Sequence, residues 1–146
     1  VERCRRGAHW TWDGVGFEWL HPGDALQPKD NDRSCVLLVR AGPRTVLLTG
    51  DIEPEAQSVV MARPSPGAHV VKVPHHGSRY QVPQFARWSG ARIALFSVGR
   101  DNDYGHPSES TLLQYRAVGA RIGRTDQQGD LAVIPAAGGS ALVVRR

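Results

Sequence analysis

The segment Thr45-Val46-Leu47-Leu48-Thr49-Gly50-Asp51 decides how this chain is interpreted. An apolar, strand-like run ends at a glycine, which allows a sharp backbone turn, and an acidic residue follows at once. Histidines follow two later apolar runs in the segments Lys72-Val73-Pro74-His75-His76-Gly77-Ser78 and Tyr104-Gly105-His106-Pro107. If the three runs are neighbours in a parallel sheet, these polar side chains converge at its carboxyl edge, where open α/β sheets build their sites.

The surrounding pattern predicts an α/β fold with a mixed sheet. Two hairpins are expected near the N-terminus, one turning at Asp13-Gly14 and one joining residues 36–40 to 45–49. Helices are predicted at 54–63, at 82–89 and from Ser108, a favourable N-cap, to Gly119. Strands predicted at 70–73 and 93–98 alternate with these helices, which implies right-handed crossovers and a parallel core. Three final strands are expected at 120–125, 131–134 and 141–144, as antiparallel strands at the margin of the sheet.

Composition bounds the class of protein without identifying a function. The chain has 146 residues, 40% hydrophobic and 22% charged, which suits one globular domain and argues against wholesale disorder. The net charge is +4, and only Lys29 and Lys72 among the 18 basic residues are lysines, so 16 are arginines. A basic surface favours anionic partners such as nucleic acid, although an excess of this size can equally reflect overall composition.

Cys4 and Cys35 lie 31 positions apart and form no C-x-x-C motif, which excludes a zinc knuckle. One disulfide in an oxidising compartment is possible, but two unrelated thiols are favoured. No apolar stretch approaches the roughly 20 residues that are needed to span a bilayer.

Asp51 and His106 are the predicted metal ligands. A carboxylate at a strand end has two oxygens and can bridge two cations, although Asp51 could instead cap the helix that begins near Pro54. His106 precedes a predicted helix N-terminus, whose dipole disfavours the protonated ring, and a metal requires the neutral ring. Carboxylate and imidazole together are a common donor set for hydrolytic metal centres.

His76 and His75 are the predicted catalytic residues. Adjacent side chains point in opposite directions on an extended backbone, so at most one of the two imidazoles is expected to face the site, with His76 slightly favoured. The other would pack or hold the loop through a hydrogen bond.

Four further residues are predicted to contact substrate: Ser78, Lys72, Asn102 and Tyr104. Ser78 supplies a hydroxyl beside the histidine pair, and Lys72 could reach a phosphate as a point charge or face outward from an edge. Asn102 and Tyr104 belong to a polar run before His106 that could position a phosphate or form a solvated loop.

On these motifs the chain resembles the C-terminal part of the metallo-β-lactamase-like domain of the ComEC family, channel proteins that import DNA during natural competence. The resemblance runs from about residue 10 to 134. It is carried by Asn31–Leu37, Leu47–Asp51, Lys72–Ser78, Ser97–Gly99 with Asn102, Tyr104–Pro107, and Arg124–Asp126 with Gly129.

The resemblance implies an αβ/βα sandwich related to metal-dependent phosphodiesterases and nucleases. It implies a divalent metal, zinc or manganese, with Asp51 as the bridging carboxylate and His106 as the last histidine ligand. The substrate would be DNA, as a single strand, and the parent would be a plasma-membrane or inner-membrane channel protein. The domain would lie on the non-cytoplasmic side, which would also permit Cys4–Cys35 pairing.

One family feature is missing from the sequence. Metallo-β-lactamase-like enzymes carry an early His-x-(His/Asp)-x-Asp-His cluster, and no such cluster occurs here. We therefore expect residues 1–146 to form one partial domain, the second lobe, without the lobe that holds the metal motif. Such a fragment would bind metal weakly or not at all, be inactive alone, and self-associate through the sheet face that the other lobe covers. The alternative is a non-catalytic, arginine-rich module that guides DNA to the channel.

Overall fold

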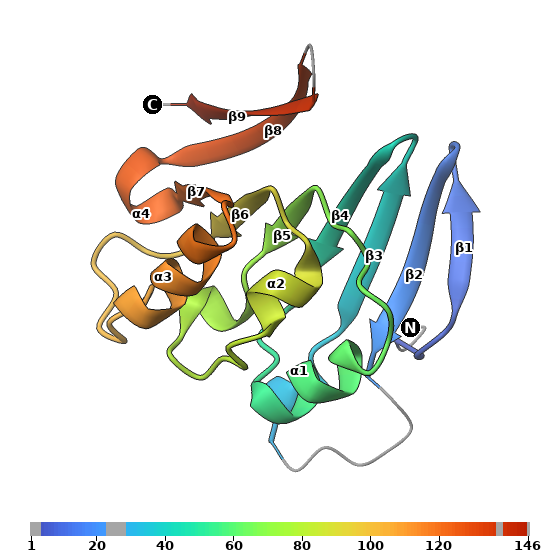
Figure 1. Ribbon diagram of the computed structural model, residues 1–146, viewed down its shortest axis with the longest axis horizontal. Coiled ribbons are helices and arrows are strands. Elements are labelled where there is room, and N and C mark those ends of the chain that lie inside the picture. The colour runs from blue at the N-terminus through green and yellow to red at the C-terminus, as the bar shows by residue number, and fades with distance from the viewer. Residues whose placement is uncertain (1–3, 23–28, 137–138, 146) are drawn as a thin grey trace.

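The computed structural model describes residues 4–22, 29–136 and 139–145. Its main feature is a seven-stranded mixed sheet whose spatial order, β1 to β7, follows the order of the strands along the chain (Figure 1). The fold is therefore α/β with a mixed sheet, as the sequence predicts. The strands of this sheet are β1 (His9–Trp12), β2 (Val15–His21), β3 (Val36–Ala41), β4 (Arg44–Leu48), β5 (Val70–Lys72), β6 (Ile93–Phe96) and β7 (Arg121–Arg124).

The first four strands are antiparallel and the last four are parallel, with β4 in both sets. The expectation of an antiparallel strand at 120–125 is therefore wrong, because α3 crosses over between β6 and β7 and returns the chain in the same direction. The first hairpin turns at Asp13 and Gly14, with φ values of 48° and 74°, as a tight two-residue turn requires. Parallel pairing of β4, β5 and β6 brings the carboxyl ends of these strands, and the loops that follow them, to one edge of the sheet.

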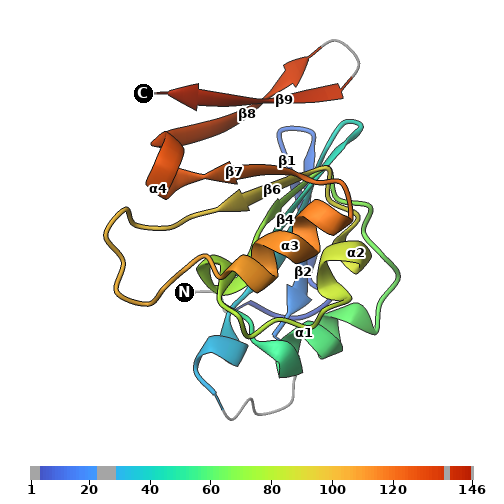
Figure 2. The same cartoon turned by 60° about the vertical axis from the view of Figure 1, so that its left-hand side comes forward.

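Three helices cover one face of the sheet (Figure 2). They are α1 (Pro54–Met61), α2 (Phe85–Ser89) and α3 (Glu109–Ala117), and α3 is capped by the Ser108 hydroxyl as predicted. Two short 3₁₀ turns, η1 (Asn31–Arg33) and η2 (Pro74–Gly77), lie in loops. The main core lies between the helices and the sheet and is built from Leu38, Leu47, Val71, Phe85, Phe96, Leu112 and Tyr115 with their neighbours.

Two element predictions are corrected by the structure. The second helix begins at Phe85 and not at Val82, because Val82 precedes Pro83 and the residue before a proline is disfavoured in helical backbone. Residues 125–128, expected as a strand end and a turn, form the short helix α4 (Thr125–Gln128), in which the Thr125 hydroxyl bonds back to Val98.

The C-terminal strands β8 (Asp130–Ala136) and β9 (Gly139–Arg145) form a separate antiparallel hairpin (Figure 1). Leu131 and Val133 of β8 pack with Val70 and Ile93 on the sheet face opposite the helices. The hairpin therefore covers the β5–β6 part of that face.

The β1–β4 part of the same face, here called the outer face, carries apolar side chains. Strand register places them on one side, away from the helices: Trp10, Phe17, Trp19, Leu37, Val39, Val46 and Leu48. Trp10 stacks on Phe17 with ring centroids 5.1 Å apart, yet Trp10 and Leu48 are each 41% exposed. No helix in the described part of the chain is long and apolar enough to cross a membrane.

Candidate functional site

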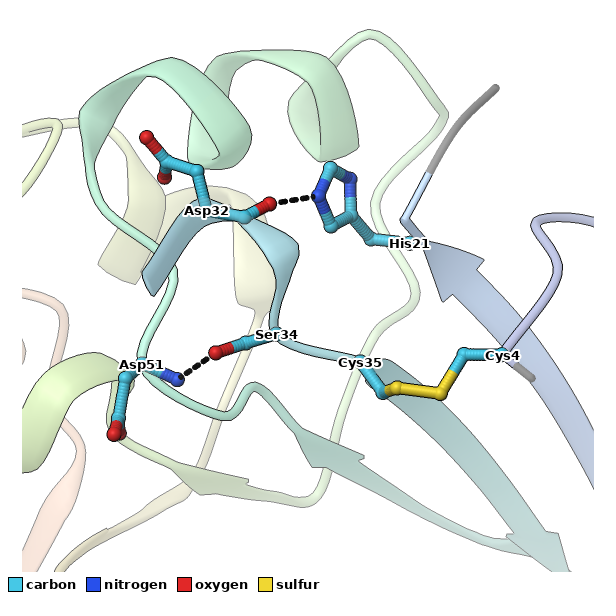
Figure 3. Close-up of a disulfide and its surroundings, with 6 residues drawn as sticks. All are labelled: Cys4, His21, Asp32, Ser34, Cys35 and Asp51. Carbon is cyan, nitrogen blue, oxygen red and sulfur yellow. Dashed lines mark hydrogen bonds between the residues drawn. A yellow bond between two sulfur atoms is a disulfide. The ribbon is translucent and has the colours of Figure 1, made fainter. Parts of the chain in front are cut away.

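Asp51 lies in the loop that follows β4, and Ser34 holds it there. The Ser34 hydroxyl accepts the Asp51 N–H at 3.1 Å, and the Asp51 carboxylate points away from Ser34 (Figure 3). Gly50 permits this approach, since its φ is +56° and a Cβ on it would lie 2.7 Å from the Ser34 Cβ. Asp51 does not cap α1, because the N-cap position is Glu53.

The segment that contains Ser34 is itself secured on both sides. Cys35 forms a disulfide with Cys4, with Cα atoms 5.9 Å apart (Figure 3). Buried His21 donates through Nε2 to the Asp32 carbonyl at 2.7 Å, and the Asp32 carboxylate accepts the Glu53 N–H at 2.9 Å. The sequence favoured two unrelated thiols, and the structure shows instead that the cysteines are paired. The disulfide thus connects the N-terminal segment to the segment that holds Asp51 through Ser34.

Lys72 lies opposite Leu48 in the register of β5 with β4, next to the same loop. Its ammonium donates to the Gly50 carbonyl at 2.8 Å and to Asp51 Oδ1 at 3.1 Å. Lys72 is therefore a partner of Asp51 on an inner strand, and not the outward edge residue that was one of the two alternatives.

His75 and His76 do not have the extended backbone that the sequence analysis assumed. Their φ values are 48° and 54°, a left-handed conformation that is uncommon for residues other than glycine. The expectation that at most one of the two rings faces the site is therefore wrong. His76 Nδ1 donates to the Ser97 carbonyl at 2.6 Å, and its Nε2 lies 3.6 Å from Asp51 Oδ1.

His75 faces the other side of the site. Its ring lies 5.6 Å from the His106 ring, centroid to centroid, and its Nδ1 is 3.6 Å from Glu53 Oε1. Nδ1 is buried and has no hydrogen-bond partner among the described residues. The two adjacent histidines thus connect Asp51 on one side with His106 on the other.

His106 is held by its backbone and not by its ring. The Asn102 side chain donates to the His106 carbonyl at 2.8 Å and accepts the His106 N–H at 3.0 Å. Burial, and then the nearby His75 and His76 rings, lower the pKa of His106, while Asp51 acts in the opposite direction. The structure therefore favours a neutral imidazole at this position.

The two remaining predicted substrate residues differ in exposure. Ser78 is buried; its hydroxyl accepts the Tyr80 N–H at 3.2 Å, and its carbonyl accepts the Thr111 hydroxyl at 2.7 Å. Tyr104 is 83% exposed, and its ring stacks on His106 at 5.9 Å. Ser78 thus holds the histidine loop against α3, whereas Tyr104 is open to a ligand.

The metal donors of the site are incomplete within the described residues. The only group there with three donor atoms within 4.8 Å of one another is Asp32, Glu53 and Glu55, which excludes Asp51 and every histidine. Lys29 already donates to Glu53 at 3.1 Å and to Glu55 at 3.2 Å. Asp51, His76 and His106 do not bring three donor atoms this close together, so by themselves they do not provide the three or four ligands that a zinc centre uses.

Sequence reasoning missed Ser34, Glu53, Arg79 and Tyr80. Arg79 and Tyr80 line a hollow together with His75 and His106. They directly follow the histidine motif, so their position was a usable signal. Ser34 and Glu53 carried no such signal, since their roles depend on contacts across 17 and 22 residues of chain, to Asp51 and to His75.

Comparison with known proteins finds relatives with names from competence and recombination. The chain is 35% identical to 125 residues of Competence protein ComA of Neisseria gonorrhoeae, which is 84% of this chain and 18% of that protein. It is 33% identical to 132 residues of Recombination protein 2 of Haemophilus influenzae, covering 89% of this chain and 16% of that protein. It is 34% identical to 137 residues of ComE operon protein 3 of Bacillus subtilis, which covers 82% of this chain and 18% of that protein.

No protein-family model matches the chain, and no solved structure matches it. The chain spans less than a fifth of the length of these curated relatives. Over most of its own length, this chain is therefore homologous to one segment of the longer proteins named for competence and recombination.

Proposed function

We propose that this chain is the C-terminal lobe of a metal-dependent, nuclease-like domain of a competence protein that takes up DNA. The observation that carries the proposal is the grouping of Asp51, His75, His76 and His106 at one edge of a parallel sheet. The names of the relatives support the competence part of the proposal. Acid and imidazole groups at such an edge suit phosphodiester hydrolysis with bound metal.

The lobe would belong to a metallo-β-lactamase-like αβ/βα sandwich. Helices cover only one face of its sheet, and the outer face bears exposed apolar side chains such as Trp10 and Leu48. In the proposed sandwich, a second sheet from another part of the full-length protein covers this face. Without it, apolar area of this kind favours association with a second copy.

The metal would be zinc or manganese, and this chain would provide only part of its ligands, Asp51 and His106. The described donors do not complete a centre, so the remaining ligands would come from a different segment of the full-length protein. This chain alone is therefore expected to bind metal weakly or not at all, and to be inactive.

The residues present would act on the phosphodiester through charge and hydrogen bonding. Lys72 donates to the Asp51 carboxylate, and His76 Nε2 faces the same carboxylate from 3.6 Å. A phosphate that approaches this edge would meet the Lys72 ammonium and the His76 ring, and His76 would orient or neutralise it. His75 lies near both Glu53 and the His106 ring and would hold these two side chains in place.

The second candidate function is a non-catalytic DNA-binding module. Two observations favour it: Lys72 forms an ion pair with Asp51, and among the described residues no group of three metal donors includes Asp51. Arginine-rich lobes with a net charge of +4 can bind a phosphate backbone without cutting it. Its partner would be single-stranded DNA on its way to the channel portion of the same protein.

We propose a location on the non-cytoplasmic side of a plasma or inner membrane for the full-length protein's domain. The Cys4–Cys35 disulfide supports this, because disulfides persist in oxidising compartments and are rare in the cytosol.

The test is cleavage of single-stranded DNA by the full-length gene product with zinc or manganese. Asp51→Asn is expected to abolish metal-dependent cleavage, whereas Asp101→Asn, an exposed loop carboxylate with the same charge change, is expected to retain it. If the protein binds DNA without cutting it, and a chelator does not change the binding, the result would support the non-catalytic DNA-binding module. Sub-micromolar zinc binding by this chain alone, measured calorimetrically, would contradict the partial-site proposal.

A further inference from the structure

A hollow of about 510 Å³ opens beside the histidines and has aromatic walls. Two tyrosines from different loops line it: Tyr80, which is 54% exposed, and Tyr104, which is 83% exposed. Both tyrosine rings are thus largely exposed to solvent, whereas aromatic side chains in folded proteins are usually at least partly buried. His75 and His106 also line this hollow.

A second hollow of about 200 Å³ shares Tyr104 and His106 with the first as lining residues. Its remaining lining residues are His76, Val98, Gly99 and Asn102. The two hollows, here together called the path, adjoin the stacked Tyr104 and His106 rings and are lined by all three site histidines.

Positive charge accompanies the aromatic rings. The exposed Arg79 guanidinium lies over one face of the Tyr80 ring, 5.4 Å from its centre, and lines the larger hollow. A guanidinium beside a bare ring offers a phosphate contact next to a stacking surface. An apolar peptide or lipid would have no use for this charge.

We propose that this path binds single-stranded nucleic acid, with bases stacked on Tyr104 and Tyr80 and a backbone phosphate held by Arg79. The proposal deepens the proposed function and rests on it, because it identifies how a strand would lie beside Asp51 and the histidines. Stacking accepts any base, since every base has a flat π face, so the site is expected to be tolerant of sequence.

The test measures binding and not cleavage, in the presence of a chelator. A fluorescent oligothymidylate is titrated with this chain, and anisotropy gives the dissociation constant. Tyr104→Ala and Tyr80→Ala are each expected to weaken binding by about five- to 150-fold, the range that one stacked base contributes. Tyr104→Phe and Tyr80→Phe keep the ring and are expected to bind as the unchanged chain does.

Two controls separate stacking from general effects. Trp12→Ala removes an exposed ring, 75% exposed, at the far tip of the first hairpin, and is expected to leave binding unchanged. An oligonucleotide of the same length with abasic sites keeps the phosphates and is expected to bind all variants within about twofold. Circular dichroism confirms that each variant is folded.

The proposal is overturned if the alanine variants bind oligothymidylate as well as the unchanged chain, or if they lose as much affinity for the abasic strand. It is also overturned if the phenylalanine variants lose as much as the alanine variants. Because no metal is present, a full-length protein that proves unable to cut DNA refutes the nuclease proposal and leaves this result unaffected.

Discussion

Replacing Gly77 with alanine is expected to destabilise the protein strongly, because this glycine is the residue at which the histidine loop packs directly on the core. Its φ is +82°, and a Cβ built on it would lie 2.5 Å from the Phe96 ring and 2.8 Å from the Pro107 Cβ. Phe96 is fully buried beneath α3 and stacks edge-on against Tyr115 at 5.7 Å. The ring therefore cannot move aside without repacking its neighbours.

The magnitude has two parts. A left-handed backbone costs an alanine about 1–2 kcal/mol, and forcing extra volume into a packed core costs about 1–3 kcal/mol. The sum is about 2–5 kcal/mol, a large share of the roughly 5–15 kcal/mol that stabilises a typical domain. Gly119→Ala is the matched control, since its φ is +78° and nothing lies within 4 Å of the added Cβ.

Urea denaturation followed by tryptophan fluorescence measures both variants, since the chain has four tryptophans. Gly119→Ala is expected to lose only the backbone part, so the two variants should differ by about 1–3 kcal/mol. A difference below about 0.5 kcal/mol, the usual size of a surface effect, would refute the close approach of Gly77 to Phe96.

Three further predictions concern the site and its supports. The pKa of His106 is lowered from its ordinary 6.5, mainly by burial, so the unfolded chain binds more protons than the folded chain. The free energy of unfolding is therefore expected to fall as the pH drops from above 6.5 toward the lower pKa of the folded state. Denaturation measured across this pH range should show that His106→Gln lacks this part of the loss. Replacing Cys4 and Cys35 with serine is expected to lower the free energy of unfolding by about 3–4 kcal/mol, from the 31-residue separation that the disulfide closes; equal stability of oxidised and reduced chain would contradict this. Sedimentation velocity is expected to show that the chain self-associates with rising concentration and that Leu48→Lys weakens this association. A monomer at every concentration would argue against self-association through the outer face.

The sequence predicted where the candidate site residues lie in the fold better than it predicted their backbone conformations. Each of Asp51, His76 and His106 follows an apolar run and a turn residue, and this local pattern is visible in any single sequence. The same pattern suggested an extended backbone at His75 and His76, which the structure contradicts with positive φ values. Those values occur in a tight turn whose next residue, Gly77, approaches Phe96, a contact 19 residues distant in sequence.

The sequence by itself determined the order of strands and helices except for the short helix α4, because hydrophobic periodicity, the Asp13-Gly14 turn and the Ser108 cap act over a few neighbouring residues. Only the tertiary structure decided that Lys72 neutralises Asp51, that Cys4 pairs with Cys35, and that Tyr80 and Tyr104 face one hollow. These contacts join segments 21 to 31 residues apart, and their geometry follows from strand register and loop packing, which no local pattern encodes.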